Sequence, residues 1–202
     1  MLKADRSRRW TPGQERWVIW LLLALFVGIG FVRFYEKSGE DLASSYLGCR
    51  LIATGHADAL YNFDPDNFAG IGPGDVWQKT AKIGGFTGFI HPYVQTPLWG
   101  YGLEPVCMHT SFPVFNRIFL LLIMLSFAGA IWLIARYWTP SLLHPVPLAI
   151  VLVCFWFSQP FQYAMFLMQT HALFFVLAIG SLILAQRDRP VLAGFLLACA
   201  AA

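Results

Sequence analysis

The sequence predicts an all-α integral membrane protein with about five transmembrane helices. Of its 202 residues, 57% are hydrophobic and only 12% are charged, which is more apolar than the core of a soluble domain requires. The apolar residues are gathered into runs of membrane-spanning length, and the segments between the runs hold nearly all of the charge, Gly and Pro. This composition excludes a soluble or disordered protein and gives no sign of a nucleic-acid partner. Membrane lipids are the first partners to expect.

The first apolar run, residues 17–34, follows a basic N-terminal segment, residues 1–16. Positive charge next to a transmembrane helix favours the cytoplasmic side, so we expect the N-terminus in the cytoplasm and the protein in the plasma (inner) membrane. No small-x-small triplet follows the run, which therefore predicts an uncleaved anchor helix rather than a secretory signal. The basic residues of the N-terminal segment are Lys3, Arg6, Arg8, Arg9 and Arg16.

Residues 35–113 form a long segment that carries eight acidic and four basic side chains. This balance predicts a large outer loop on the periplasmic or extracellular side. Within it, residues 41–53 place apolar side chains at helical spacing and predict a short amphipathic helix lying on the membrane surface, with Ser44, Ser45 and Arg50 on its polar face. The Gly-rich residues 67–88 predict a mobile loop over a site.

The remaining spans are expected at residues 114–138, 143–159, 163–186 and 190–202. Basic residues at the end of the first of these runs, and again between the last two, fit the same topology. The last run stops at Ala202 inside an Ala- and Leu-rich segment, with no charge or interfacial aromatic residue to end it. We therefore expect the sequence to be the N-terminal part of a longer protein.

The four cysteines have no metal-type spacing, and no metal or other cofactor is expected. Cys154 and Cys199 lie in apolar runs, where cysteine behaves as a small hydrophobic residue. Cys49 and Cys107 both fall in the predicted outer loop, where a disulfide is chemically permitted. The sequence leaves open whether their backbones approach closely enough to pair.

Two groups of residues follow a known pattern. The first lies in the outer loop and comprises Asp41-Leu42, Tyr46, Gly55, Leu60-Tyr61, His91-Pro92-Tyr93, Pro97-Leu98 and Leu103-Glu104-Pro105; the second comprises Met168-Gln169-Thr170-His171, Arg187-Asp188-Arg189-Pro190 and Leu192-Ala193-Gly194. In order and spacing, these groups resemble the family 87 glycosyltransferases, polytopic enzymes of the GT-C superfamily. Met168 and His171 stand where that family usually has Gly and Asn.

The resemblance implies transfer of a sugar, commonly mannose, from a polyprenyl-phosphate donor to an acceptor hydroxyl at the outer membrane face, with inversion at the anomeric carbon. Such chemistry needs one carboxylate to take the acceptor proton, and donors or cations to hold the departing phosphate. Asp41 matches the general base of the family. The expected substrate-binding residues are His91, Arg50, Gln169, His171 and Tyr46. The lipid-linked donor is a substrate, so it is expected as a partner and not as a cofactor.

Other interpretations of the same residues are open. Asp41 also suits the N-cap of a helix, where a carboxylate stabilises the first turn by about 1 kcal/mol without any catalysis. Asp64 is a reserve base, although Asp64-Pro65 is most simply a turn. Paired intramembrane charges and an inverted repeat, which would favour a transporter, are not found in the sequence.

A different class of function is a non-catalytic membrane subunit or scaffold that packs against membrane-protein partners on the same fold. The environment of Asp41 discriminates between the two hypotheses. The enzyme predicts that Asp41 opens into a cavity within reach of Gln169 or His171. The scaffold predicts that Asp41 contacts only amides of its own helix.

Overall fold

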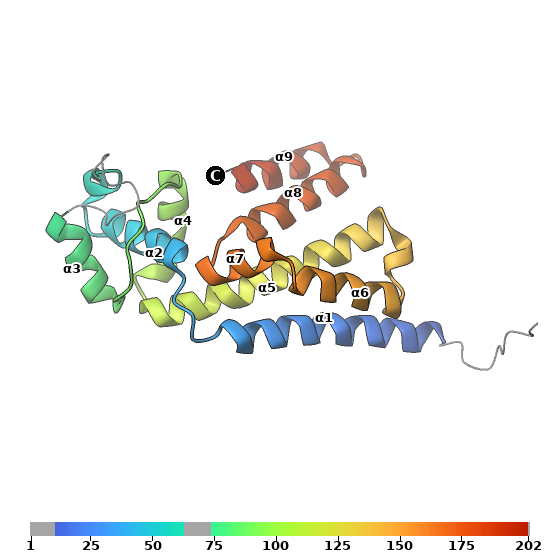
Figure 1. Cartoon of the computed structure of the whole chain (residues 1–202). Coiled ribbons are helices and arrows are strands. Elements are labelled where there is room, and N and C mark those ends of the chain that lie inside the picture. Colours follow the sequence, from blue (N-terminus) through green and yellow to red (C-terminus); the bar gives the residue numbers. More distant parts are fainter. Residues whose placement is uncertain (1–10, 63–73, 202) are drawn as a thin grey trace, which may run out of the picture.

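The computed structural model describes residues 11–62 and 74–201, and every regular element in this part of the chain is helical (Figure 1). The all-α class that the sequence predicts is confirmed for these residues. In chain order the elements are α1 (Pro12–Phe34), α2 (Glu40–Ala53), η1 (Ala57–Ala59), α3 (Gly74–Gly84), α4 (Pro97–Cys107), α5 (Phe112–Tyr137), η3 (Pro140–Leu142), α6 (Pro145–Trp156), α7 (Gln159–Leu167), α8 (His171–Ala185) and α9 (Pro190–Ala201).

Two helices, α1 and α5, are each long and apolar enough to cross a membrane, with 23 and 26 residues. At about 1.5 Å per residue each exceeds the roughly 30 Å of a hydrocarbon core. A capping box begins α1. The Thr11 hydroxyl accepts a hydrogen bond from the backbone N–H of Gln14, and the side-chain oxygen of Gln14 accepts one from the backbone N–H of Thr11. Pro12 occupies the first position of the helix. The two helices pack against each other and run in opposite directions (Figure 1).

Helices α6 and α7 meet at an angle of 61°. Together they form a third candidate span if the two helices cross the membrane as one bent segment. The sequence predicts a helix to residue 159 and a continuous span over 163–186. The chain instead ends α6 at Trp156, forms α7 up to Leu167, and starts α8 at His171. The break has a local cause, because Met168 adopts the left-handed conformation (φ 54°, ψ 50°) that commonly terminates helices. The polar residues Gln169 and Thr170 follow Met168, but nothing in the sequence reveals the left-handed conformation that ends α7.

Helices α2, α3 and α4 gather beyond one end of α1 and α5 (Figure 1). Helix α2 is the core of this part rather than the surface-lying amphipathic helix that the sequence predicts. Every residue from Leu42 to Cys49 is buried, including Ser44 at 3% and Ser45 at 0% exposure. The expected polar face is therefore wrong, because α3, α4 and α5 all pack on this helix.

A disulfide between Cys49 and Cys107 joins α2 to α4, with the two Cα atoms 6.5 Å apart. This settles the pairing that the sequence leaves open. The separation lies within the usual range for a disulfide-bonded pair.

The expected mobile loop over residues 67–88 contains the helix α3, while residues 67–73 lie outside the described residues. Trp77 and Ala81, four residues apart on one helix face, are buried. The Trp77 Nε1 donates a hydrogen bond to the Ala59 carbonyl oxygen at 3.0 Å. The expectation of a loop fails here because the glycine content conceals this helical period.

Candidate functional site

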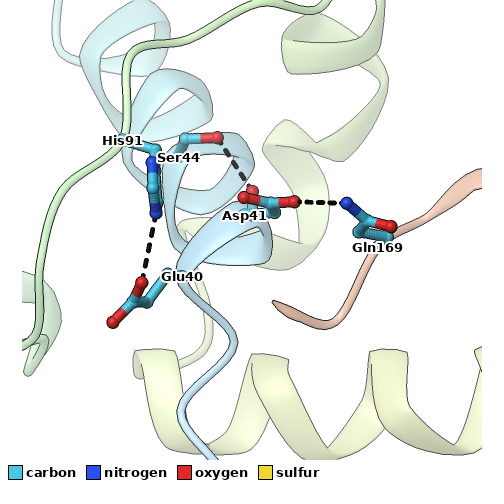
Figure 2. Close-up of polar contacts among 5 residues, drawn as sticks. All are labelled: Glu40, Asp41, Ser44, His91 and Gln169. Carbon is cyan, nitrogen blue, oxygen red and sulfur yellow. Dashed lines mark hydrogen bonds and ion pairs between the residues drawn. The ribbon is translucent and has the colours of Figure 1, made fainter. Parts of the chain in front are cut away.

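Asp41 is the second residue of α2, where its negative charge is stabilised by the positive end of the helix dipole. The N-cap is Gly39, and no side chain caps the helix, so capping is not the role of Asp41. Its Oδ2 instead accepts a hydrogen bond from the Gln169 Nε2 at 2.9 Å (Figure 2). The Asp41 side chain is half-buried and therefore combines this partner with access to solvent.

The start of α2 is fixed to α5 by one buried amide, that of Asn116. Its Nδ2 donates to the Lys37 carbonyl oxygen at 2.7 Å, and its Oδ1 accepts from the Gly39 backbone N–H at 3.3 Å. Asn116 is 4% exposed, so both bonds are largely shielded from water. The amide thereby sets where α2 begins, and with it the position of Asp41.

Gln169 reaches Asp41 because the chain breaks between α7 and α8. Met168 is fully buried at the break and lies directly against Gly39. A Cβ added at Gly39 would lie 2.2 Å from the Met168 Cβ, closer than any real packing contact. This close backbone approach brings together two residues, Asp41 and Gln169, that are 128 positions apart in the sequence.

Asp41 lines a cavity of about 440 Å³. Its walls come from the start of α2, from the segment after Phe89 and from the break before α8, and they combine polar side chains with an apolar remainder. This size and lining are typical of a site for a small molecule or for the head of a larger one. The lining residues are Asp41, Ser44, His91, Pro92, Val94, Gln95, Met168, Gln169, Thr170, His171 and Phe174.

His91 lies beside the first turn of α2, with its Nε2 3.1 Å from the Glu40 Oε2 (Figure 2). Its ring packs edge-on against Phe89, with the ring centroids 5.0 Å apart. Glu40 is not predictable as a partner of His91, because the two residues are 51 positions apart and no periodic pattern in the sequence relates them. His91 lines the cavity together with Asp41 and Gln169, whereas Glu40 contacts His91 without lining the cavity itself.

The segment that carries His91 is held in place by two tyrosines. The Tyr61 hydroxyl donates to the Gln95 carbonyl oxygen at 2.5 Å, and the Tyr93 hydroxyl donates to the Thr96 carbonyl oxygen at 2.8 Å. Burial raises the pKa of Tyr93 well above its usual value, and the nearby Tyr61 raises it further. Desolvation also raises the pKa of Tyr61. Both hydroxyls therefore keep their protons and act as neutral donors.

Ser44 and Gln95 also contribute to the polar lining, and the sequence predicted neither of them as a site residue. The Ser44 hydroxyl donates to the Asp41 backbone oxygen at 2.8 Å (Figure 2), which bends the side chain back onto its own helix. The Gln95 Oε1 accepts from the Ser45 hydroxyl at 2.6 Å, so the Gln95 side chain is oriented by α2.

The structure does not bring Tyr46 and Arg50 to this cavity, although the sequence analysis groups them with Asp41. Tyr46 is fully buried, and its hydroxyl donates to the Thr110 carbonyl oxygen at 2.8 Å. The Arg50 Nη1 donates to the Tyr46 hydroxyl and to the Cys107 carbonyl oxygen, both at 3.0 Å. The reason is helical geometry, because nine residues of α-helix turn Arg50 about 180° away from Asp41.

Of the expected site residues, Asp41, His91, Gln169 and His171 therefore share one cavity. His171 is an exposed residue at the start of α8. The reserve base Asp64 lies outside the described residues. Within residues 11–62 and 74–201, no three His, Cys, Asp or Glu side chains are grouped so as to hold a metal ion.

The chain matches no protein-family model, no curated protein and no solved structure with which it was compared. Over residues 11–62 and 74–201 the structure is all-helical, and two of its helices, or three with the bent pair, are long and apolar enough to cross a membrane. The resemblance to family 87 glycosyltransferases is an expectation from the sequence, and the cavity at Asp41 is the structural feature that bears on function.

Proposed function

We propose that the chain is a membrane glycosyltransferase that transfers a sugar from a polyprenyl-phosphate donor to an acceptor hydroxyl, with inversion. The observation that carries the proposal is the Asp41 carboxylate at the wall of a cavity, hydrogen-bonded to the side chain of Gln169 from the break before α8. The scaffold hypothesis expects Asp41 to contact only amides of its own helix. The Gln169 contact favours the enzyme.

In the proposed reaction Asp41 is the general base. As the acceptor oxygen attacks the anomeric carbon, the Asp41 carboxylate takes the hydroxyl proton. The bond between the anomeric carbon and the phosphate oxygen breaks, and the polyprenyl phosphate leaves with the bonding electron pair. Inversion requires a single displacement, so no covalent intermediate on the protein is needed.

The other polar residues of the cavity have binding roles in this proposal. Gln169 holds the carboxylate in place through its 2.9 Å hydrogen bond, and His171 at the start of α8 faces the phosphate. His91 on the opposite rim offers a second donor. The long prenyl chain would lie along the apolar helices, which explains why such a site belongs in a protein with membrane-spanning helices.

The proposed reaction takes place at the outer membrane face and therefore requires a particular topology. The N-terminus lies in the cytoplasm, α2 to α4 lie at the outer face, and the shorter helices α8 and α9 act as further spans to give about five in total. The disulfide between Cys49 and Cys107 supports this arrangement, because disulfides persist in oxidising compartments.

The test is transfer of radiolabelled mannose from a polyprenyl-phosphate donor by membranes that contain the full chain. Asp41→Asn keeps the size of the side chain and removes the base, and a lost general base typically lowers the rate by about 10²- to 10⁴-fold. The matched control is Asp58→Asn, since Asp58 is an exposed carboxylate of η1 that does not line the cavity. This control is expected to retain wild-type activity.

Equal activity of wild type and Asp41→Asn would refute the role of Asp41. Absence of transfer by the wild type with mannose, glucose, galactose and arabinose donors would favour the scaffold instead. In that case a stable membrane-protein partner should be recovered by crosslinking, and Asp41→Asn should leave its recovery unchanged.

A further inference from the structure

A second cavity, of about 480 Å³, lies at the opposite end of the molecule from Asp41, between the N-terminal end of α1 and the C-terminal end of α5. Six of the side chains that line it carry the argument: Glu15, Arg16, Ile19, Trp20, Trp132 and Arg136. None of them takes part in the proposed glycosyl transfer. The two helices run in opposite directions, which brings these two ends together (Figure 1).

The two helices present the same arrangement to this cavity. On α1, Arg16 precedes Trp20 by four residues, and on α5, Trp132 precedes Arg136 by four residues. Because the helices are antiparallel, both indoles lie about 6 Å deeper toward the middle of the helix pair than the arginines. The two indoles stack, with ring centroids 5.8 Å apart and an interplanar angle of 29°. This stack fixes the register in which Arg16 and Arg136 face one cavity.

The charges of this cavity are not balanced within the described residues. Glu15 is the one carboxylate among the lining residues, and its Oε1 lies 3.6 Å from the His144 Nε2. Neither Arg16 nor Arg136 has an ion pair with a carboxylate in the part of the chain that the structure describes. Two guanidinium groups on one cavity repel each other, and an anion between them would remove that repulsion. Arginine also matches the oxygen geometry of a phosphate.

The order of charged, aromatic and apolar side chains from the rim of the cavity to its floor matches an anion that carries an apolar part. Charge lies at the outer rim, stacked indoles lie below it, and the buried Ile19 is part of the floor. Tryptophan rings prefer the level of the lipid headgroups, and the remaining length of α1 and α5 is apolar. A soluble phosphate would use the rim only, whereas a glycerophospholipid would use both the rim and the indole floor.

We propose that this cavity binds the headgroup of an anionic glycerophospholipid, with Arg16 and Arg136 on the phosphate and Trp20 and Trp132 beneath the glycerol backbone. Basic pockets between transmembrane helices are known to take such headgroups. The site is separate from the Asp41 cavity and does not depend on the proposed reaction. It would anchor the ends of α1 and α5 in one leaflet.

The test measures the binding of phosphatidylglycerol to the purified full chain in detergent by native mass spectrometry, with phosphatidylcholine of the same acyl chains as the comparison. Each guanidinium is expected to contribute a factor of about five in affinity. Arg16→Gln/Arg136→Gln should therefore bind phosphatidylglycerol about 25-fold more weakly, and each single variant about five-fold more weakly.

The matched control is Arg187→Gln/Arg189→Gln, which removes the same amount of charge from a site outside the cavity. Both arginines belong to the turn between α8 and α9, Arg187 stacks over the ring of Tyr137 at the end of α5 at 4.9 Å, and neither control residue lines the cavity. The control should bind within about two-fold of wild type. A second variant, Leu143→Trp, keeps both arginines and fills the cavity, and it should lose most of the binding.

Equal loss in the two double variants would overturn the proposal, because surface charge alone would then explain the binding. Wild-type binding by Leu143→Trp, or equal affinity for phosphatidylcholine, would also overturn it. Displacement of phosphatidylglycerol by millimolar inorganic phosphate would show a simple anion site instead of a lipid site. Where the double variant does not fold, as judged by size exclusion and circular dichroism, the single variants carry the same test.

Discussion

Gly39→Ala offers the sharpest test of how the Asp41 cavity is assembled. The backbone of Gly39 (φ −75°, ψ 105°) lies in a region open to every residue, so alanine costs nothing in backbone conformation. The added Cβ would lie 2.2 Å from the Met168 Cβ and 3.1 Å from the Asn116 Oδ1. Carbon atoms pack at about 3.5–4.0 Å, so α2 and the break before α8 must separate by more than about 1 Å. Overpacking of this kind costs about 1–3 kcal/mol.

The measurement is the free energy of unfolding of the full chain in mixed micelles, with Gly28→Ala as the control. Gly28 lies inside α1, and an added Cβ there meets no atom within 4 Å. Alanine in a helix interior is favoured over glycine by about 0.5–1 kcal/mol. Gly39→Ala should therefore destabilise the protein, while Gly28→Ala should leave its stability unchanged or raise it.

Two backgrounds identify Met168 as the cause. Met168→Gly removes the Cβ that alanine at position 39 would meet, whereas Met168→Ala keeps it. In a double-mutant cycle, Gly39→Ala should cost less than about 0.5 kcal/mol beside Met168→Gly, and clearly more beside Met168→Ala, where the Cβ contact at 2.2 Å remains although the Cγ contact is gone. The reasoning is refuted if Gly39→Ala costs the same in both backgrounds, or if it behaves as Gly28→Ala does.

Three further predictions concern the surroundings of the cavity. Cys49 and Cys107 close a loop across a sequence separation of 58, so reduction should lower the free energy of unfolding by on the order of 4 kcal/mol, and a double serine variant should not respond to reductant. Asn116→Leu leaves the Lys37 carbonyl and the Gly39 N–H without their partner, and chemical denaturation should show a loss of about 2–3 kcal/mol; no loss would refute the role of Asn116 in fixing the start of α2. The pKa of Tyr93 is raised above 10.0 in the folded state, so its contribution to stability is complete below pH 10.0 and declines as the pH rises above that value. Tyr93→Phe should flatten this alkaline decline in unfolding measurements between pH 9 and pH 11, and an unchanged decline would contradict the assignment.

The long helices could be predicted from the sequence because their evidence is local. The run expected at 17–34 lies within α1, and the run expected at 114–138 differs from α5 by two residues at its start and one at its end. Uninterrupted apolar composition decides such segments, since backbone hydrogen bonds in a membrane must be satisfied within the helix. The same reasoning missed the break at Met168, because the polar residues 169–171 were assigned to a continuous span and the left-handed conformation of Met168 cannot be seen in a hydropathy average.

The outer segment was predicted less well because tertiary contacts override its local pattern. Residues 41–53 do form a helix, as expected, yet Ser44 and Ser45 are buried rather than exposed. Burial of both hydroxyls is tolerated because each donates a hydrogen bond. The Ser44 hydroxyl donates to the Asp41 carbonyl oxygen, and the Ser45 hydroxyl donates to the Gln95 side chain. Amphipathic spacing cannot distinguish a surface helix from one whose polar groups are satisfied inside the protein.

Site residues were predicted where a motif marks them and missed where only the fold joins them. Asp41, His91, Gln169 and His171 were singled out from three separate stretches of sequence, and all four line one cavity. Glu40 was missed because its partner His91 lies 51 residues away and shares no periodicity with it. Arg50 is expected as a cation for the departing phosphate, but the helix turns it to the opposite side from Asp41.

The contact between Gly39 and Met168 joins two of the segments that line the cavity. Its walls come from α2, from the segment around His91 and from the break before α8, so no single stretch of the chain can form it alone. The meeting of Gly39 and Met168 fixes how closely α2 approaches that break, and the Asp41–Gln169 hydrogen bond spans the same junction. A side chain larger than glycine at position 39 would push apart the two segments that this bond joins. Fold and site therefore depend on the same junction, and a change of stability at Gly39 should be accompanied by a change in the reach of Asp41.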